Sequence, residues 1–224
     1  MIHAMALERR LFWVFLWVLA MAALEAAVVV YLRELFCPEG TLFPVLDVSG
    51  DARLMRIRLT ELFREPATLA MLAAVAALAG ATPWQRWAVF MLLFGLWDLL
   101  YYAWLYVLLG WPRSLLAWDV LFLIPVNWTG PVLAPCLVSA ALVGAAAAIL
   151  RWEGDGVLQA FRGVDWALEI MAGLTVILAF VSNWRLSQLR PEAQLRFPWL
   201  VFGTGLALGV AVFLGALRRG LRAR

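Results

Sequence analysis

The sequence predicts an all-α integral membrane protein with about six transmembrane helices. Its 224 residues are 65% hydrophobic with a mean hydropathy of +0.89, whereas soluble domains are roughly 45–50% apolar. Six segments approach the ~20 apolar residues that a helix needs to cross a bilayer. No remaining segment is long enough to fold alone, so residues 1–224 are expected to form a single polytopic membrane domain.

The six expected spans are bounded by Arg, Pro or Gly, as helix ends in membranes often are. They cover roughly residues 11–33, 66–82, 85–109, 131–150, 164–183 and 197–217. The first is too long for the apolar region of a signal peptide, and no small-residue cleavage site follows it. We therefore expect it to be retained as a helix.

Two further segments are expected to be helical without forming full spans. Residues 52–65 repeat apolar side chains at helical spacing with arginines between them, which is typical of an amphipathic helix at the membrane interface. Pro66 then allows a bend into the second span. Residues 114–126 carry an apolar run too short to span, with Pro125 and Pro131 framing its end. A re-entrant or interfacial helix is favoured there over a short seventh span, and a re-entrant segment would mark a cavity.

The arginine distribution gives a weak indication of orientation. Six spans place both termini on one side, and Arg9, Arg10 and the tail at 218–224 favour a cytoplasmic location for them, in a bacterial inner membrane. The 18 basic residues, all arginine, otherwise divide evenly between the two sides.

Several function classes lack the residues they require. The chain has no lysine, His3 is its only histidine, and Cys37 and Cys136 form no metal-binding spacing. A haem or zinc site and any His-dependent catalytic triad are thereby excluded, and no metal or cofactor is expected. The arginines scatter over helix ends instead of forming one basic face, so nucleic acid is not an expected partner.

Charged side chains at membrane depth are rare and usually functional, and here they gather in one half of the predicted bundle. Glu25 and Asp98 lie near the middle of spans one and three, and Glu65 opens span two. The other candidate binding residues in this outer half are Arg33, Glu34, Arg64, Trp97, Tyr101, Tyr102, Trp118, Asp119 and Asn127. A site between the first three spans, roofed by residues 114–128, would bring them together.

Two interpretations of this cluster remain open. In the structural one, Arg33 and Arg64 pair with Glu34, Glu65 or Asp119 and pin the helices together, while Tyr and Trp form an interfacial belt. In the functional one, a carboxyl group stays unpaired in apolar surroundings, where it can act as a general acid at neutral pH. Asp98 and Glu25 are the candidate acids, with Glu65 as a third, and nearby aromatic faces could stabilise a cation.

The functional interpretation predicts binding or acid–base processing of a lipophilic small molecule, such as a membrane lipid or an isoprenoid. The Trp97-Asp98 doublet resembles the intramembrane acids of small membrane terpene cyclases, but the resemblance stops at that doublet and no family is assigned.

Two alternatives are a non-catalytic subunit of a membrane complex and a small proton- or cation-coupled transporter. The small residues Gly203, Ala207, Ala211 and Gly215 would suit a homodimer face or ordinary packing within the chain.

Overall fold

The computed structural model describes residues 2–36, 52–183 and 196–223, so Cys37 lies outside the described residues. Within these ranges six helices are long and apolar enough to cross a membrane, which confirms the all-α membrane fold. They are α1 (Ile2–Phe36), α2 (Ala52–Ala79), α3 (Pro83–Leu109), α4 (Leu133–Trp152), α5 (Gly163–Val181) and α7 (Trp199–Arg222).

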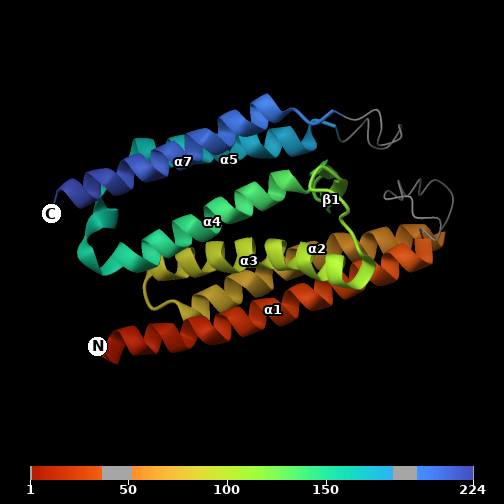
Figure 1. Cartoon of the computed structure of the whole chain (residues 1–224), viewed down its shortest axis with the longest axis horizontal. Helices are drawn as coiled ribbons and strands as arrows, with labels where there is room; N and C mark the ends of the chain where they lie inside the picture. Colours follow the sequence, from red (N-terminus) through yellow and green to blue (C-terminus); the bar gives the residue numbers. More distant parts are fainter. Residues whose placement is uncertain (1, 37–51, 184–195, 224) are drawn as a thin grey trace.

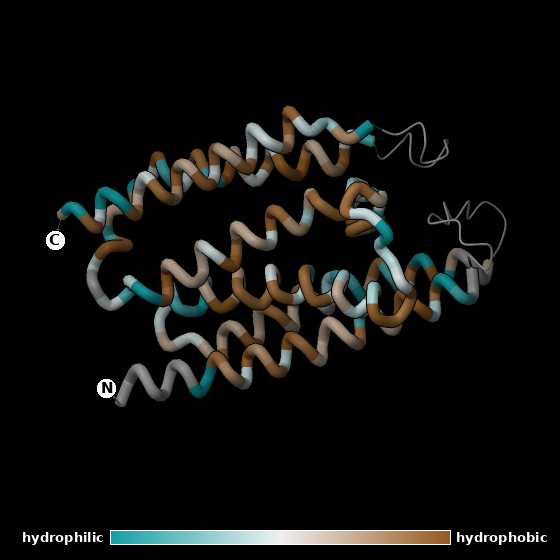
Figure 2. Tube along the Cα trace, viewed as in Figure 1, coloured by the Kyte–Doolittle hydropathy of each residue, from teal (hydrophilic) through white to brown (hydrophobic). Residues whose placement is uncertain are grey.

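The helices run alternately in opposite directions, so α1 begins and α7 ends at the same end of the bundle (Figure 1). We call this the terminal end, and it also holds the short helices η1 (Glu153–Asp155) and η2 (Val157–Ala160). We call the opposite end the hairpin end, because a short β-hairpin lies there. Apolar residues cover most of the helix length (Figure 2). That the terminal end faces the cytoplasm stays a prediction.

Helix α2 corrects the prediction of a separate interfacial helix at 52–65, because it continues through Pro66 to Ala79. The amphipathic pattern is real, but its polar side faces the protein. Glu61 and Glu65 are buried, whereas Leu59 and Phe63 are exposed. An apolar face turned outward and a polar face turned inward suit a helix surrounded by lipid.

The predicted helix at 114–126 is wrong, since this segment belongs to an antiparallel β-hairpin. Strand β1 (Trp118–Phe122) pairs with β2 (Trp128–Pro131), and Asp119 lies opposite Gly130. Prolines at the end of the segment remove backbone donors that a helix requires. The aromatic and β-branched side chains of β1 favour an extended backbone instead.

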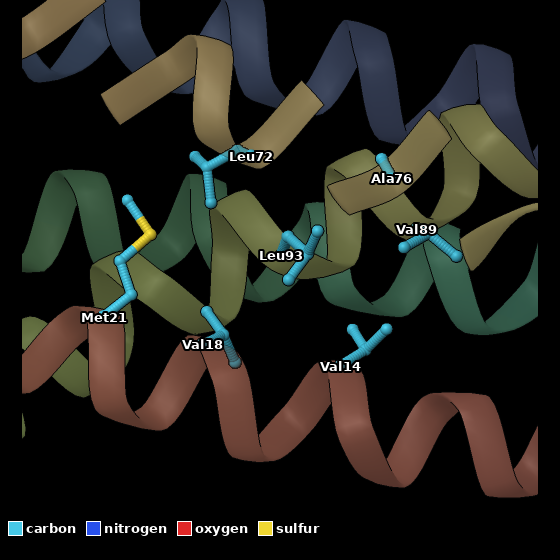
Figure 3. Close-up of a cluster of buried hydrophobic side chains, with 7 residues drawn as sticks. All are labelled: Val14, Val18, Met21, Leu72, Ala76, Val89 and Leu93. Carbon is cyan, nitrogen blue, oxygen red and sulfur yellow. The ribbon is translucent and has the colours of Figure 1, made fainter. Parts of the chain in front are cut away.

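An apolar cluster joins α1, α2 and α3 toward the terminal end (Figure 3). Its buried members are Val14, Val18, Met21, Leu72, Ala76, Val89 and Leu93. On α3 the indole N–H of Trp104 also donates to the backbone oxygen of Leu19 on α1, at 3.2 Å. Apolar packing therefore fills the terminal half of these helices, and their buried charged residues, among those described, lie in the hairpin half.

The last span uses only some of its small residues for contacts within the chain. A Cβ on Gly205 would lie 3.0 Å from the backbone oxygen of Ala172, so α5 and α7 pack closely there. A Cβ on Gly203 would meet nothing within 4 Å, and Ala207 and Ala211 are exposed. The homodimer through this second face stays a prediction.

Helices α3 and α4 pack closely at Gly95, where a Cβ would lie 2.7 Å from the backbone oxygen of Ser139. Gly95→Ala is therefore expected to lower the free energy of unfolding by about 1–3 kcal/mol through overpacking. The measurement is unfolding by denaturing detergent in mixed micelles.

Gly144→Ala on α4 is the matched control, since its Cβ would meet nothing within 4 Å. This control should be neutral or stabilising by up to about 1 kcal/mol. Equal stability of the two variants would contradict the close α3–α4 contact.

Candidate functional site

A cavity of about 440 Å³ occupies the hairpin-end half of the bundle. Its walls come from α1, α2, α3, α4, α5 and both strands of the hairpin. Its polar and charged lining residues are Glu25, Arg33, Glu61, Arg64, Glu65, Thr68, Asp98, Tyr101, Tyr102, Asp119, Asn127 and Ser139. The remaining walls are mainly apolar and aromatic.

Arg64 of α2 holds the ionic network between α1 and α2. Its guanidinium pairs with Glu25 of α1, and its Nη2 and Nε atoms lie 2.7 and 2.9 Å from Oε2 of Glu61. The hydroxyl of Thr68 donates to Glu25 at 2.8 Å. Glu25, a candidate for an unpaired acid, therefore has a cationic partner, and this arginine comes from another helix.

A second network fixes the hairpin to α1 and α3. Arg33 lies 3.8 Å from Oδ1 of Asp119, and its guanidinium stacks 4.0 Å above the ring of Trp111. The hydroxyl of Tyr102 donates to Oδ2 of Asp119 at 3.1 Å. The pairing of Arg33 with Asp119 that the structural interpretation predicted is confirmed.

Glu65 supports the hairpin from α2. Its two carboxylate oxygens lie 2.8 and 3.0 Å from the backbone nitrogen of Leu123, which donates to them. It forms no ion pair with an arginine among the described residues. Glu65 thus accepts the hydrogen bond of the backbone N–H of Leu123. This N–H lies just beyond β1, and no strand residue among those described accepts from it.

Asp98 is held differently from the other carboxylates of the cavity. Its Oδ2 accepts a hydrogen bond from the hydroxyl of Ser139 on α4 at 2.7 Å. Within the described ranges it has no arginine at ion-pair distance. Asp98 therefore presents a carboxyl group to the cavity with one neutral hydrogen-bond donor as its partner.

Aromatic rings form a connected series along the cavity, from α3 through the hairpin to α5. Phe94 packs against Trp97 with ring centroids 5.5 Å apart, and Trp97 lies 6.3 Å from Phe122. Phe122 lies 5.5 Å from Trp128, which stacks on Phe180 at 6.3 Å. The indole N–H groups of Trp97 and Trp128 are buried and have no hydrogen-bond partner in the described part of the chain.

The structure brings most of the predicted site residues together around this cavity. Lining it are Glu25, Arg33, Arg64, Glu65, Trp97, Asp98, Tyr101, Tyr102, Asp119 and Asn127. Glu34 is exposed and does not line the cavity. Trp118 does not line it either, since its ring packs against Phe197 with centroids 6.3 Å apart.

Several lining residues were missed by the sequence reasoning. Glu61 belonged to the segment assigned to the interface, although its four-residue spacing from Glu65 already placed both on one helix face. Ser139 is the polar side chain in the apolar centre of α4 and could have been noticed for that reason. The sequence carries no comparable signal for Gly173, Val176 or Ile177 of α5, which complete the wall.

Among the described residues, no three His, Cys, Asp or Glu side chains gather in an arrangement that could hold a metal ion. Comparisons with protein-family models, with curated proteins and with solved structures give no match. The function is therefore argued from the cavity itself.

Removing Arg64 should destabilise the fold, because Glu25 and Glu61 would lose their cation in a poorly hydrated site. Arg64→Met is expected to lower the free energy of unfolding by about 3 kcal/mol, the lower part of the range for breaking a buried pair. Adding Glu25→Gln and Glu61→Gln should restore a large part of this loss. Detergent unfolding checks both variants, and an unchanged stability of Arg64→Met would show that the pair is not structural.

Proposed function

We propose that this membrane protein binds a lipophilic small molecule in the cavity at its hairpin end, with the polar group of that molecule at Asp98. The observation that carries the proposal is the carboxyl group of Asp98, which lines the cavity and has only Ser139 as a hydrogen-bond partner among the described residues. Ionisable groups at membrane depth are costly and mark functional sites by default.

The size and lining of the cavity support a small-molecule ligand. Its volume of about 440 Å³ falls within the roughly 300–1,000 Å³ of ligand pockets, which are mostly apolar with a few polar groups. The aromatic series from Phe94 to Phe180 offers flat apolar surfaces for the body of such a molecule. An acceptor atom on the ligand that reached Trp97 or Trp128 would also supply a partner for a buried indole N–H.

The packing beyond the cavity favours binding over transport across the bundle. On α1, α2 and α3 the cavity residues are followed toward the terminal end by the apolar cluster around Val18, Leu72 and Leu93. Glu169 precedes the lining residues of α5, nearer the terminal end, and does not line the cavity. A conducting path would need polar groups or water between these levels, and among α1, α2 and α3 the apolar cluster occupies that position.

The same geometry suits proton exchange with a bound molecule. The Ser139 hydroxyl orients one oxygen of Asp98, and the other oxygen remains for the ligand. A carboxyl group in such surroundings can hold or release a proton near neutral pH. For a ligand that carries a titratable group, proton exchange is therefore the chemistry that we assign to Asp98.

A cavity-filling variant tests the proposal. The probe is decanol carrying a photoreactive diazirine on its chain, applied to the protein in lipid nanodiscs. We expect crosslinks to Phe94, Trp97 or Phe122, which line the cavity. Gly173 also lines it, and a Cβ there would meet nothing within 4 Å, so Gly173→Leu should fill the space without a clash. Labelling of the cavity residues should fall about tenfold, which corresponds to ~1.4 kcal/mol of binding free energy.

Gly203→Leu is the matched control, since it lies on α7 outside the cavity and also has open space at its Cβ. Mass spectrometry of the crosslinked peptides measures both variants. Absence of cavity labelling in the wild-type protein, or equal labelling in the two variants, would rule out the proposed function.

A further inference from the structure

We infer that the molecule bound in this cavity carries a cationic head, an amine or a quaternary ammonium group, on an apolar body. This inference rests on the proposed function and names its ligand class. It is carried by the arrangement of charges and aromatic rings around one cavity.

The cavity has more carboxylates than arginines to pair with them. Five carboxylate side chains and two arginines line it, namely Glu25, Glu61, Glu65, Asp98 and Asp119 against Arg33 and Arg64. With all of these groups ionised the lining carries three negative charges more than positive ones (five minus two).

The pairing within the cavity leaves specific carboxylates for a ligand. Arg64 is engaged by Glu25 and Glu61, and Arg33 by Asp119 and the ring of Trp111. Neither Glu65 nor Asp98 forms an ion pair within the described ranges. A buried carboxylate without a counter-charge is unfavourable, and a cationic head would supply that counter-charge.

The aromatic walls point to the same ligand class independently of the carboxylates. The face of a Trp or Phe ring attracts a cation within about 6 Å of its centroid, most strongly where water is excluded. Trp97 immediately precedes Asp98 on α3 and lines the cavity with it, and Phe122 and Trp128 continue the series across the hairpin. A positively charged head near Asp98 would therefore meet both a carboxylate and aromatic faces.

An anionic head would find no comparable site. Recognition of a phosphate or carboxylate group depends on arginine donors arranged around it. Both arginines of the cavity already form ion pairs with carboxylates, and an anion would have to displace Glu25, Glu61 or Asp119. The charge arrangement thus disfavours anionic lipids and fatty acids as occupants.

A competition experiment distinguishes these ligand classes. The photoreactive decanol labels the wild-type protein in nanodiscs of neutral lipid, and unlabelled decylamine, decyltrimethylammonium, decanol or decanoate is added as competitor. We expect the two cations to halve cavity labelling at a concentration about tenfold below that of decanol, which corresponds to ~1.4 kcal/mol and lies between the values for exposed and fully desolvated cation–aromatic contacts. Decanoate should be the weakest competitor.

Charge-neutralising variants locate the cause of this preference. Asp98→Asn and Glu65→Gln keep an oxygen that accepts the hydrogen bond from Ser139 or Leu123, so both variants should fold. Each should reduce the advantage of decylamine over decanol severalfold, and the double variant should abolish most of it. Glu169→Gln is the matched control, because it removes a carboxylate on α5 that does not line the cavity, and it should leave the advantage unchanged.

The outcomes separate the inference from the proposed function. Cavity labelling that decanol or decanoate displaces as well as decylamine does would overturn the cationic head and leave the binding function standing. An advantage of decylamine that survives in the double variant would also overturn the inference. Failure of the probe to label the cavity at all would instead reject the proposed function.

Discussion

The ionic contact of Arg64 with Glu25 and Glu61 is the interaction on which the hairpin-end half of the bundle depends. It joins α1 to α2 on the hairpin side of the apolar cluster around Val18 and Leu72, and it fixes the rotation of α2 about its own axis. Because Glu61, Glu65 and Thr68 recur at helical spacing, one rotation turns all three toward the cavity. The same rotation leaves Leu59 and Phe63 facing outward.

The hairpin depends in turn on these oriented carboxylates. Non-helical backbone at membrane depth is tolerated only where it is buried in protein or lines a cavity. Glu65 accepts the N–H of Leu123, and Asp119 connects β1 to Tyr102 and Arg33. These carboxylates therefore hold the fold together and also line the cavity. The structural interpretation of the sequence accounts for their contacts, and the functional interpretation stays a proposal.

The requirements of the bilayer made most of the fold predictable from the sequence. Contacts between segments far apart in the sequence could not be predicted in this way. Lipid demands about 20 apolar residues in each span, so the six helices followed from hydropathy. An amphipathic pattern does not reveal which side faces water, which is why residues 52–65 were misassigned. The short apolar run before Pro125 fits a strand as well as a helix.

The candidate site was predictable only in part, because the sequence indicates which residues lie at a similar depth in the membrane. Depth placed Asp98, Glu65 and Asp119 at one level of the bundle, and the cavity does gather them. The partner of Glu25 lies 39 residues away in the sequence, so local spacing could not identify it. The contribution of α5 depends on how α5 packs beside the hairpin, which no local pattern encodes.

The order of residues along α3 indicates how an amphiphilic ligand would lie. Leu93 belongs to the apolar cluster, Phe94 begins the aromatic wall, and Asp98 follows one turn later. An apolar body fits toward Phe94, where its neighbours are rings, and a charged head fits toward Asp98. A ligand in the reverse orientation would leave its head against the apolar cluster and Asp98 against its chain. Since both contacts bury a charge without a partner, the first orientation is the one that the cavity favours.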